Sequence, residues 1–263
     1  DFGSMKISTQ ERIDNVDYHF SHSERDRNLI NYQDVYNFNS LEKYLRRSIS
    51  YIFSHSQKMK PEIIHSASNF VVGMAGAKAA KALGIPSIYE IRGFWHLTQS
   101  TKRLGYEGSD HYLLTERLEI ETAKMSDHVF TITRALKDIL IENGISESKI
   151  TVLPNAVDPS KFKISKKDKQ LEKELDFQNK VVIGYIGSFV EYEGLDLLLE
   201  ACAILNKKLG DCFRLLLVGD GEVMQQLRAS SRFLQLEDIV RFTGRVSHED
   251  VNQYYSLIDI APL

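Results

Sequence analysis

Short apolar runs alternate with amphipathic segments along most of this chain, and the alternation limits the folds it can adopt. Between residues 61 and 153 the apolar runs have the length of strands, and the intervening segments carry apolar residues at helical spacing. The predicted elements are strands at 63–65, 87–91, 128–132 and 149–153 and helices at 70–83, 112–125 and 133–143. Gly84 is expected to end the helix 70–83. Strands that alternate with helices in this way form βαβ units, so the sequence predicts an α/β fold with a parallel sheet.

The alternation starts again near residue 181, after a stretch that is rich in lysine and glutamate. The elements predicted there are strands at 181–186, 214–218, 240–243 and 259–261 and helices at 195–205, 222–231 and 247–257. We interpret the charged stretch as a solvated linker between two domains. The predicted division is a domain at 1–162, a linker at 163–180 and a domain at 181–263. The last strand has only begun where the sequence stops, so we expect the second domain to be cut short.

The first sixty residues give the weakest pattern. A short strand is expected within 15–22, and residues 39–58 have helical spacing. The polar face of this helix is basic and carries Lys43, Arg46, Arg47 and Lys58. Such a face suits either anionic lipid or water. We favour a solvated face and keep peripheral membrane contact as the alternative.

The balance of charge excludes some classes of function. The chain has 33 lysines and arginines against 36 aspartates and glutamates, which argues against a general nucleic-acid binder. No apolar run reaches the roughly 18 residues of a membrane span, so we expect a cytoplasmic protein, with the inner face of the membrane as the alternative site. Cys202 and Cys212 are too few for a disulfide scaffold, and we expect two free, buried thiols.

Two glycine-containing loops follow predicted strands of the second domain. Gly187 and Ser188 lie after the strand 181–186, with Gly194 at the start of the next helix. A phosphate group suits the N–H groups at such a place, and a plain tight turn explains the glycines equally well. The loop 219–221 reads Gly-Asp-Gly but lacks the third glycine of a dinucleotide fingerprint, which disfavours a hydride-transfer enzyme. The sequence also has no P-loop pattern.

A third candidate site follows the strand 87–91 in the first domain. Residues 92–96 read Arg-Gly-Phe-Trp-His and combine a permanent cation, aromatic rings and a titratable imidazole. These groups can bind phosphate or carboxylate, stack on sugars and move protons. A cluster that packs the domain is the alternative. His19 and His22 have no further ligands at metal-site spacing, so we expect no metal.

Taken together and in order, several segments resemble the retaining glycosyltransferases of family four, which have the GT-B fold. The segments are IPSIYEIRGFW (85–95), ITVLPNAVD (150–158), IGYIGSFV (183–190), EGLDLLLEA (193–201), LVGDG (217–221) and VRFTGRV (240–246). The resemblance implies two Rossmann-like domains, and we expect both to be incomplete in this sequence. The first βα unit of the first domain is not recognisable before residue 60, and the last segments of the second domain would lie beyond residue 263. The implied reaction moves a sugar from a nucleotide-diphosphate sugar to a saccharide or lipid-linked acceptor with retention of configuration, without a metal ion, another cofactor or nucleic acid.

The resemblance also implies roles for particular residues. The donor would lie against Gly187, Ser188, Glu193, Gly194, Gly219, Gly221, Arg245 and Val246, with Arg245 and Val246 near the base. Phe94 and Trp95 would face the acceptor, and Arg92 and His96 would be catalytic.

The sequence departs from the family pattern at several of these positions. Many relatives have arginine and lysine where this sequence has Ser188 and Glu193, and histidine where it has Arg92. The expected Glu-x7-Glu segment would lie beyond residue 263. A complementary chain could supply the absent segments. The alternative functions are a non-catalytic binding or assembly module derived from such an enzyme and another GT-B enzyme, such as a sugar-nucleotide epimerase.

Overall fold

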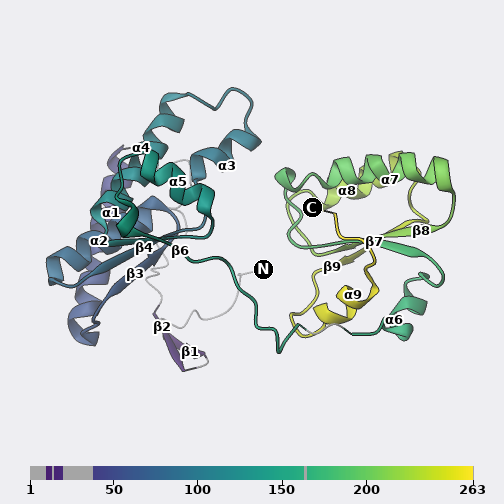
Figure 1. The fold of residues 1–263 in the computed structure, drawn as a ribbon, viewed down its shortest axis with the longest axis horizontal. Coiled ribbons are helices and arrows are strands. Elements are labelled where there is room, and N and C mark those ends of the chain that lie inside the picture. Colours follow the sequence, from purple (N-terminus) through teal and green to yellow (C-terminus); the bar gives the residue numbers. More distant parts are fainter. Residues whose placement is uncertain (1–9, 14, 20–37, 163–164, 263) are drawn as a thin grey trace. The chain divides into compact units, whose positions relative to one another are not determined.

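The structure is a computed structural model in which residues 10–13, 15–19, 38–162 and 165–262 are described. The chain divides into two compact units, Asp1–Asn155 and Ala156–Leu263 (Figure 1). Each unit contains its own parallel sheet, and each is described below by itself. The predicted α/β fold is therefore confirmed.

The sheet of unit 1 has the order β3-β4-β5-β6 with all neighbours parallel. Its strands are β3 (Ile64–Ala67), β4 (Ser87–Ile91), β5 (His128–Thr131) and β6 (Ile150–Val152). The helices are α1 (Phe38–Met59), α2 (Phe70–Leu83), α3 (Trp95–Lys102), α4 (Asp110–Met125) and α5 (Arg134–Glu142). Side chains of α4 and α5 bury one face of the sheet, where Tyr89 and Val129 lie in the core. The amphipathic α1 packs on α2.

Helix α2 shows how local sequence and packing agree. Its N-cap is Asn69, whose side chain accepts a hydrogen bond from the Val71 N–H at 3.1 Å, and Gly84 ends it in the left-handed conformation at φ 70°. A Cβ at Gly73 would lie 2.5 Å from a ring carbon of Tyr89, so glycine lets this helix lie close to the sheet. The predicted bounds, 70–83, are confirmed.

The carboxyl group of Glu119 joins three elements in the interior of unit 1. Its side chain comes from α4 and is fully buried. Its Oε2 accepts a hydrogen bond of 2.5 Å from the Tyr89 hydroxyl on β4, and its Oε1 accepts one of 3.3 Å from the Phe70 N–H at the start of α2. Burial raises the pKa of Glu119 to about 7, although both hydrogen bonds oppose that shift.

We expect the stability of unit 1 to fall as the pH rises from the ordinary glutamate pKa to about 7. In this range the unfolded chain has released the Glu119 proton while the folded chain still holds it, so rising pH favours unfolding. The loss in the free energy of unfolding is on the order of 3 kcal/mol. Urea unfolding between about pH 5 and about pH 8 measures it, and Glu119→Gln should remove it. Glu121→Gln, on the exposed side of the same helix, is the control; equal pH dependence in wild type and Glu119→Gln would contradict the assignment.

Unit 2 is a three-layer α/β/α arrangement. Its parallel sheet has the order β7-β8-β9, built from β7 (Val181–Ile186), β8 (Phe213–Val218) and β9 (Val240–Gly244). The helices are α6 (Lys169–Glu174), α7 (Leu195–Leu209), α8 (Met224–Phe233) and α9 (Val251–Leu257). Helices α7 and α8 cover one face, and α6 and α9 cover the other (Figure 1). In place of the strand predicted at 259–261 there is a single parallel bridge between Ile183 and Ile260.

The stretch 163–180 differs from the solvated linker that its charges predict. Residues 163–164 lie outside the described residues. Asp168 caps α6, Leu171 packs against the core of unit 2, and Phe177 is fully buried there. Lys167 also forms an ion pair of 2.7 Å with Asp259. Apolar side chains such as Leu171 and Phe177 fix this segment to the sheet, while Lys166, Lys169 and Lys173 are exposed. A count of charges does not reveal the buried apolar contacts.

Other expectations differ from the structure in detail. Helix α3 lies between the strand predicted at 87–91 and the helix predicted at 112–125, where no element was predicted from the sequence. The first described strands are β1 (Gln10–Ile13) and β2 (Val16–His19), an antiparallel pair, and residues 20–22 of the predicted strand lie outside the described residues. Cys202 is buried as expected, whereas Cys212 is exposed. None of the helices in the described residues is long and apolar enough to cross a bilayer.

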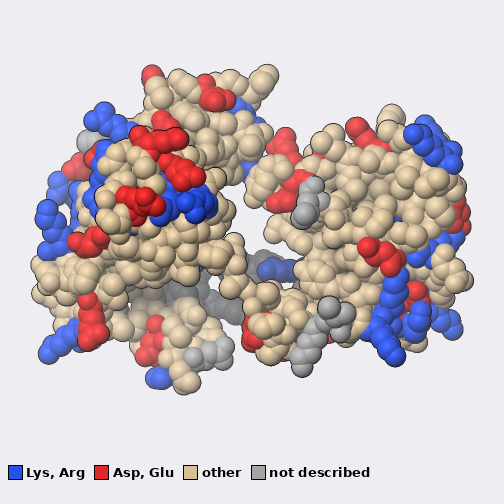
Figure 2. All heavy atoms as spheres, in the orientation of Figure 1, with Lys and Arg blue, Asp and Glu red and all other residues tan. Residues whose placement is uncertain are grey.

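Acidic and basic side chains are mixed on the surface. On the face of unit 1 that Figure 2 shows, blue and red groups lie interspersed. Arg46 on the polar face of α1, for example, pairs with Glu42 at 2.7 Å. This pairing suits the small net charge of −3.

Candidate functional site

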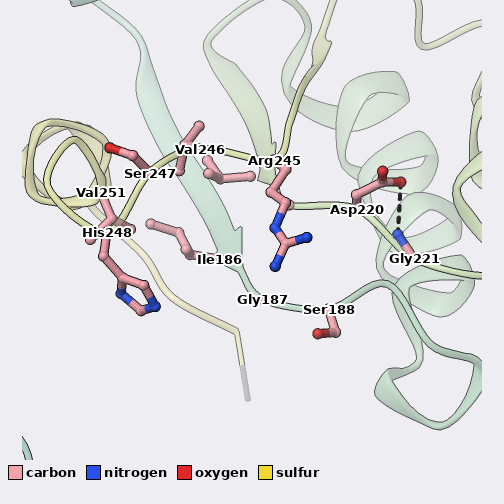
Figure 3. A pocket seen from close by; sticks show the side chains of 12 residues that line it. Ile186, Gly187, Ser188, Asp220, Gly221, Arg245, Val246, Ser247, His248 and Val251 are labelled. Carbon is pink, nitrogen blue, oxygen red and sulfur yellow. Dashed lines mark hydrogen bonds between the residues drawn. The ribbon is translucent and has the colours of Figure 1, made fainter. Parts of the chain in front are cut away.

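A cavity of about 610 Å³ lies in unit 2 where its three strands end. Parallel strands bring their carboxyl ends to the same edge of a sheet, and ligands of open α/β folds bind at that edge. The loops after β7, β8 and β9 line the cavity together (Figure 3). The lining residues are Ile186, Gly187, Ser188, Val218, Gly219, Asp220, Gly221, Arg245, Val246, Ser247, His248 and Val251.

Contacts between backbones hold the loops around the cavity. The Phe189 N–H donates to the backbone oxygen of Asp220 at 3.0 Å, and the Gly219 N–H donates to the backbone oxygen of Gly244 at 3.0 Å. A Cβ at Gly219 would lie 1.9 Å from the Gly187 oxygen, and the Gly219 φ of 136° also suits only glycine. A Cβ at Gly221 would lie 2.2 Å from the Phe189 oxygen. Both glycines are therefore needed for the loops to approach.

The cavity brings together six of the eight residues predicted to contact a donor. Gly187 and Ser188 come from the first loop, Gly219 and Gly221 from the second, and Arg245 with Val246 from the third. Sequence reasoning missed Asp220, Ser247 and His248, although each is adjacent to a predicted residue or to its neighbour. Asp220 accepts a hydrogen bond from the Gly221 N–H at 2.8 Å.

Glu193 and Gly194, the remaining two, do not line the cavity. Gly194 has a φ of 66° and forms the turn into α7. The Tyr185 hydroxyl donates to the Ser188 oxygen at 3.1 Å, and burial, followed by the nearby Glu193 carboxylate, raises the pKa of Tyr185 to about 12. Glu193 therefore lies beside the tyrosine that supports the loop.

The predicted group 92–96 in unit 1 divides into a buried and an exposed part. Phe94 and His96 are only 2% and 4% exposed, and their rings stack with centroids 5.4 Å apart. Burial lowers the pKa of His96, which favours a neutral ring, and the nearest carboxylate oxygen, on Glu116, is 3.9 Å away. Trp95 is half-buried at the start of α3. The environment of Phe94 and His96 is that of a packing cluster.

Arg92, by contrast, is exposed and held by an acidic neighbour. Its Nε donates to Glu90 Oε1 at 2.7 Å, and the other Glu90 oxygen lies 2.9 Å from His65 Nε2. The hydrogen bond from Arg92 is the main reason that the pKa of Glu90 is lowered. Sequence reasoning did not identify Glu90 or His65. Because β3 and β4 are adjacent and alternate residues of a strand point to the same face, His65 and Glu90 lie on one face of the sheet. This pairing of strands is the feature that could have identified them.

In the described part of the chain, no three His, Cys, Asp or Glu side chains lie close enough together to hold a metal ion. The Nδ1 atom of His19 lies 3.3 Å from Nε2 of His55, and His22 is outside the described residues.

Comparison with solved structures identifies the fold as GT-B. Sucrose-phosphate synthase from Thermosynechococcus elongatus matches with a TM-score of 0.71 at 14% identity, over 97% of this chain and 62% of that one. HepE from Anabaena in complex with UDP matches with a TM-score of 0.64 at 18% identity, over 81% of this chain and 55% of that one.

Comparison of sequences identifies the family. Residues 14–161 match Glycosyltransferase Family 4, and residues 166–263 match Glycosyl transferases group 1. The first match covers more than half of the chain, so this chain belongs to Glycosyltransferase Family 4.

Curated relatives show how much of such proteins the chain represents. Mannosylfructose-phosphate synthase from Agrobacterium fabrum is 28% identical over 72% of this chain and 45% of its own length. Alpha-monoglucosyldiacylglycerol synthase from Streptococcus pneumoniae is 24% identical over 82% of this chain and 49% of its own. The chain therefore spans about half the length of these relatives.

We expect Gly221→Ala to destabilise unit 2. Its Cβ would lie 2.2 Å from the Phe189 oxygen, so the two loops must separate. The free energy of unfolding should fall by about 1–3 kcal/mol, as for other overpacked sites. Gly93→Ala is the control, because a Cβ there meets nothing within 4 Å. Equal urea midpoints for wild type and Gly221→Ala would show that the loops are not held as described.

Proposed function

We propose that this chain is part of a glycosyltransferase that moves a sugar from a nucleotide-diphosphate sugar to a saccharide or lipid-linked acceptor with retention of configuration. The observation that carries the proposal is the cavity at the ends of β7, β8 and β9, whose lining includes six residues expected at the donor. Membership of Glycosyltransferase Family 4 supports the reaction class.

The chemistry of the donor explains why such a cavity is suitable. When the glycosidic bond to the nucleotide breaks, negative charge develops on the departing diphosphate. Fixed N–H groups and a cation stabilise such charge without reorganising. Holding the sugar beside an acceptor hydroxyl lowers the entropic part of the barrier. In this proposal the hydroxyl oxygen bonds to the anomeric carbon on the face that the diphosphate leaves, and a phosphate oxygen accepts the hydroxyl proton. Configuration is then retained.

The names of relatives support the choice of substrate class. A relative from Corynebacterium glutamicum, 27% identical over 78% of this chain, is a GDP-mannose-dependent alpha-mannosyltransferase. HepE has been solved with UDP-glucose. A relative from Erwinia amylovora, 30% identical over 49% of this chain, is a glycosyltransferase of amylovoran biosynthesis. UDP and GDP are therefore the nucleotides to test first.

We expect unit 2 to bind UDP or GDP in the cavity. Titration calorimetry of the chain with each nucleotide measures binding, and hydrogen exchange locates it. Protection should appear in the loops 187–189, 219–221 and 245–248, because these loops line the cavity and a bound ligand opposes the local opening that exchange requires. The amides of α2, in unit 1, are the internal control. Absence of binding by both nucleotides, or protection confined to unit 1, would contradict the proposal.

In unit 1 we propose an electrostatic role for Arg92 in the reaction. A guanidinium does not deprotonate at ordinary pH, so it cannot be a general base. In the natural protein that contains this chain, Arg92→Ala should lower kcat by about tenfold or more, with the urea midpoint almost unchanged because the side chain is exposed. Arg134→Ala, at the start of α5, is a control for removal of an exposed arginine. Unchanged kcat and unchanged stability would remove Arg92 from the mechanism.

A further inference from the structure

The loop after β7 lacks a cation where a diphosphate would need one. Position 188 is a serine, and the carboxylate of Glu193 lies beside Tyr185 and outside the cavity lining. A diphosphate carries several negative charges, and N–H groups alone supply only partial positive charge. Among the described residues that line the cavity, Arg245 has the only lysine or arginine side chain.

We propose that the Arg245 guanidinium binds the diphosphate of the donor and takes the place of the cations that the loop after β7 lacks. This inference rests on the proposed function. It assigns the Arg245 side chain to the phosphates, whereas the family resemblance placed Arg245 near the base. Arginine suits this role because its planar fork of N–H donors matches two phosphate oxygens at once.

The orientation of the side chain supports the assignment. In Figure 3, Arg245 extends from the loop after β9 into the cavity, towards the turn at Gly187 and Ser188. The Asp220 carboxylate turns the other way, to the Gly221 N–H at 2.8 Å. The guanidinium therefore faces the loop where an anion would lie, and Asp220, the one acidic residue among the described residues of the lining, accepts a hydrogen bond from Gly221 instead.

Arg245 is also available for a ligand. Its side chain is exposed and forms no hydrogen bond or ion pair with any other residue in the part of the chain that the structure describes. Arg241, within β9, differs: its guanidinium donates to the backbone oxygens of Glu237, at 3.0 Å, and Asp238, at 3.1 Å. A backbone hydrogen bond fixes the position of the Arg245 main chain, because the Gly219 N–H donates to the backbone oxygen of Gly244, the residue before Arg245. The base of the side chain is thus held in place while its charged end remains free.

A series of ligands that differ only in phosphate number tests the assignment. Uridine, UMP and UDP, and the guanosine series in parallel, are titrated into wild type, Arg245→Gln and Arg245→Lys. We expect Arg245→Gln to weaken binding of the diphosphate by about 10- to 100-fold and to leave the nucleoside unchanged, since charge-assisted hydrogen bonds have this strength. Arg245→Lys should restore part of the affinity, because it keeps the charge and loses the fork.

Lys208→Gln is the matched control, because it removes one exposed positive charge near the end of α7, away from the cavity lining. It should leave every affinity unchanged. Arg245→Gln should unfold at the wild-type temperature, since no described residue bonds to the side chain. If wild type and Arg245→Gln bind UDP or GDP with equal affinity, this inference is overturned while the proposed function stands. An equal loss for nucleoside and diphosphate would assign Arg245 to the base and also overturn it. If the wild type binds neither diphosphate, the proposed function fails, and this inference fails with it.

Discussion

The cavity of unit 2 depends on the close approach of two backbone segments. A Cβ at Gly219 or Gly221 would overlap the carbonyl oxygen of Gly187 or Phe189, so glycine is the residue that allows the loops after β7 and β8 to touch. Because both loops leave a parallel sheet at the same edge, their contact makes one wall of the cavity, and the loop after β9 completes it. Backbone contacts thus set the shape of the cavity, and the side chains that line it project from these loops.

Charge is distributed around this frame in an unusual way. The position where a lysine is common in the family is Glu193, and its carboxylate lies near the Tyr185 hydroxyl that supports the Ser188 carbonyl. The negative charge of Glu193 therefore lies outside the cavity lining. Positive charge enters from the opposite loop, on Arg245 (Figure 3). In the proposed assignment Arg245 compensates for the missing cation of the loop after β7, because the electrostatic requirement of a diphosphate concerns the cavity as a whole and not one loop.

Unit 1 shows a similar separation between residues that are neighbours in sequence. The group 92–96 is continuous in the chain, yet Arg92 faces water while His96 lies in the interior. Helix α3 starts at Trp95, and this start turns Phe94 and His96 into the core that also holds Tyr89. The sequence identified the group but not the division within it, since a short helix in a polar stretch has little periodic signal.

Local signals were sufficient for many elements of both units. The bounds of α2, β4 and β7 agree with the prediction because Gly84 follows α2, Pro86 precedes β4 and Gly187 follows β7. The family resemblance, and not the strand pattern, predicted that the loops 187–188, 219–221 and 245–246 share a site, and all three line the cavity. Tertiary structure decided the rest: the burial of Phe177, the pairing of Glu90 with His65, and the directions of Glu193 and Arg245. These features join residues from different elements or depend on which way a side chain turns. Such contacts depend on sheet register and packing, which no short stretch of sequence encodes.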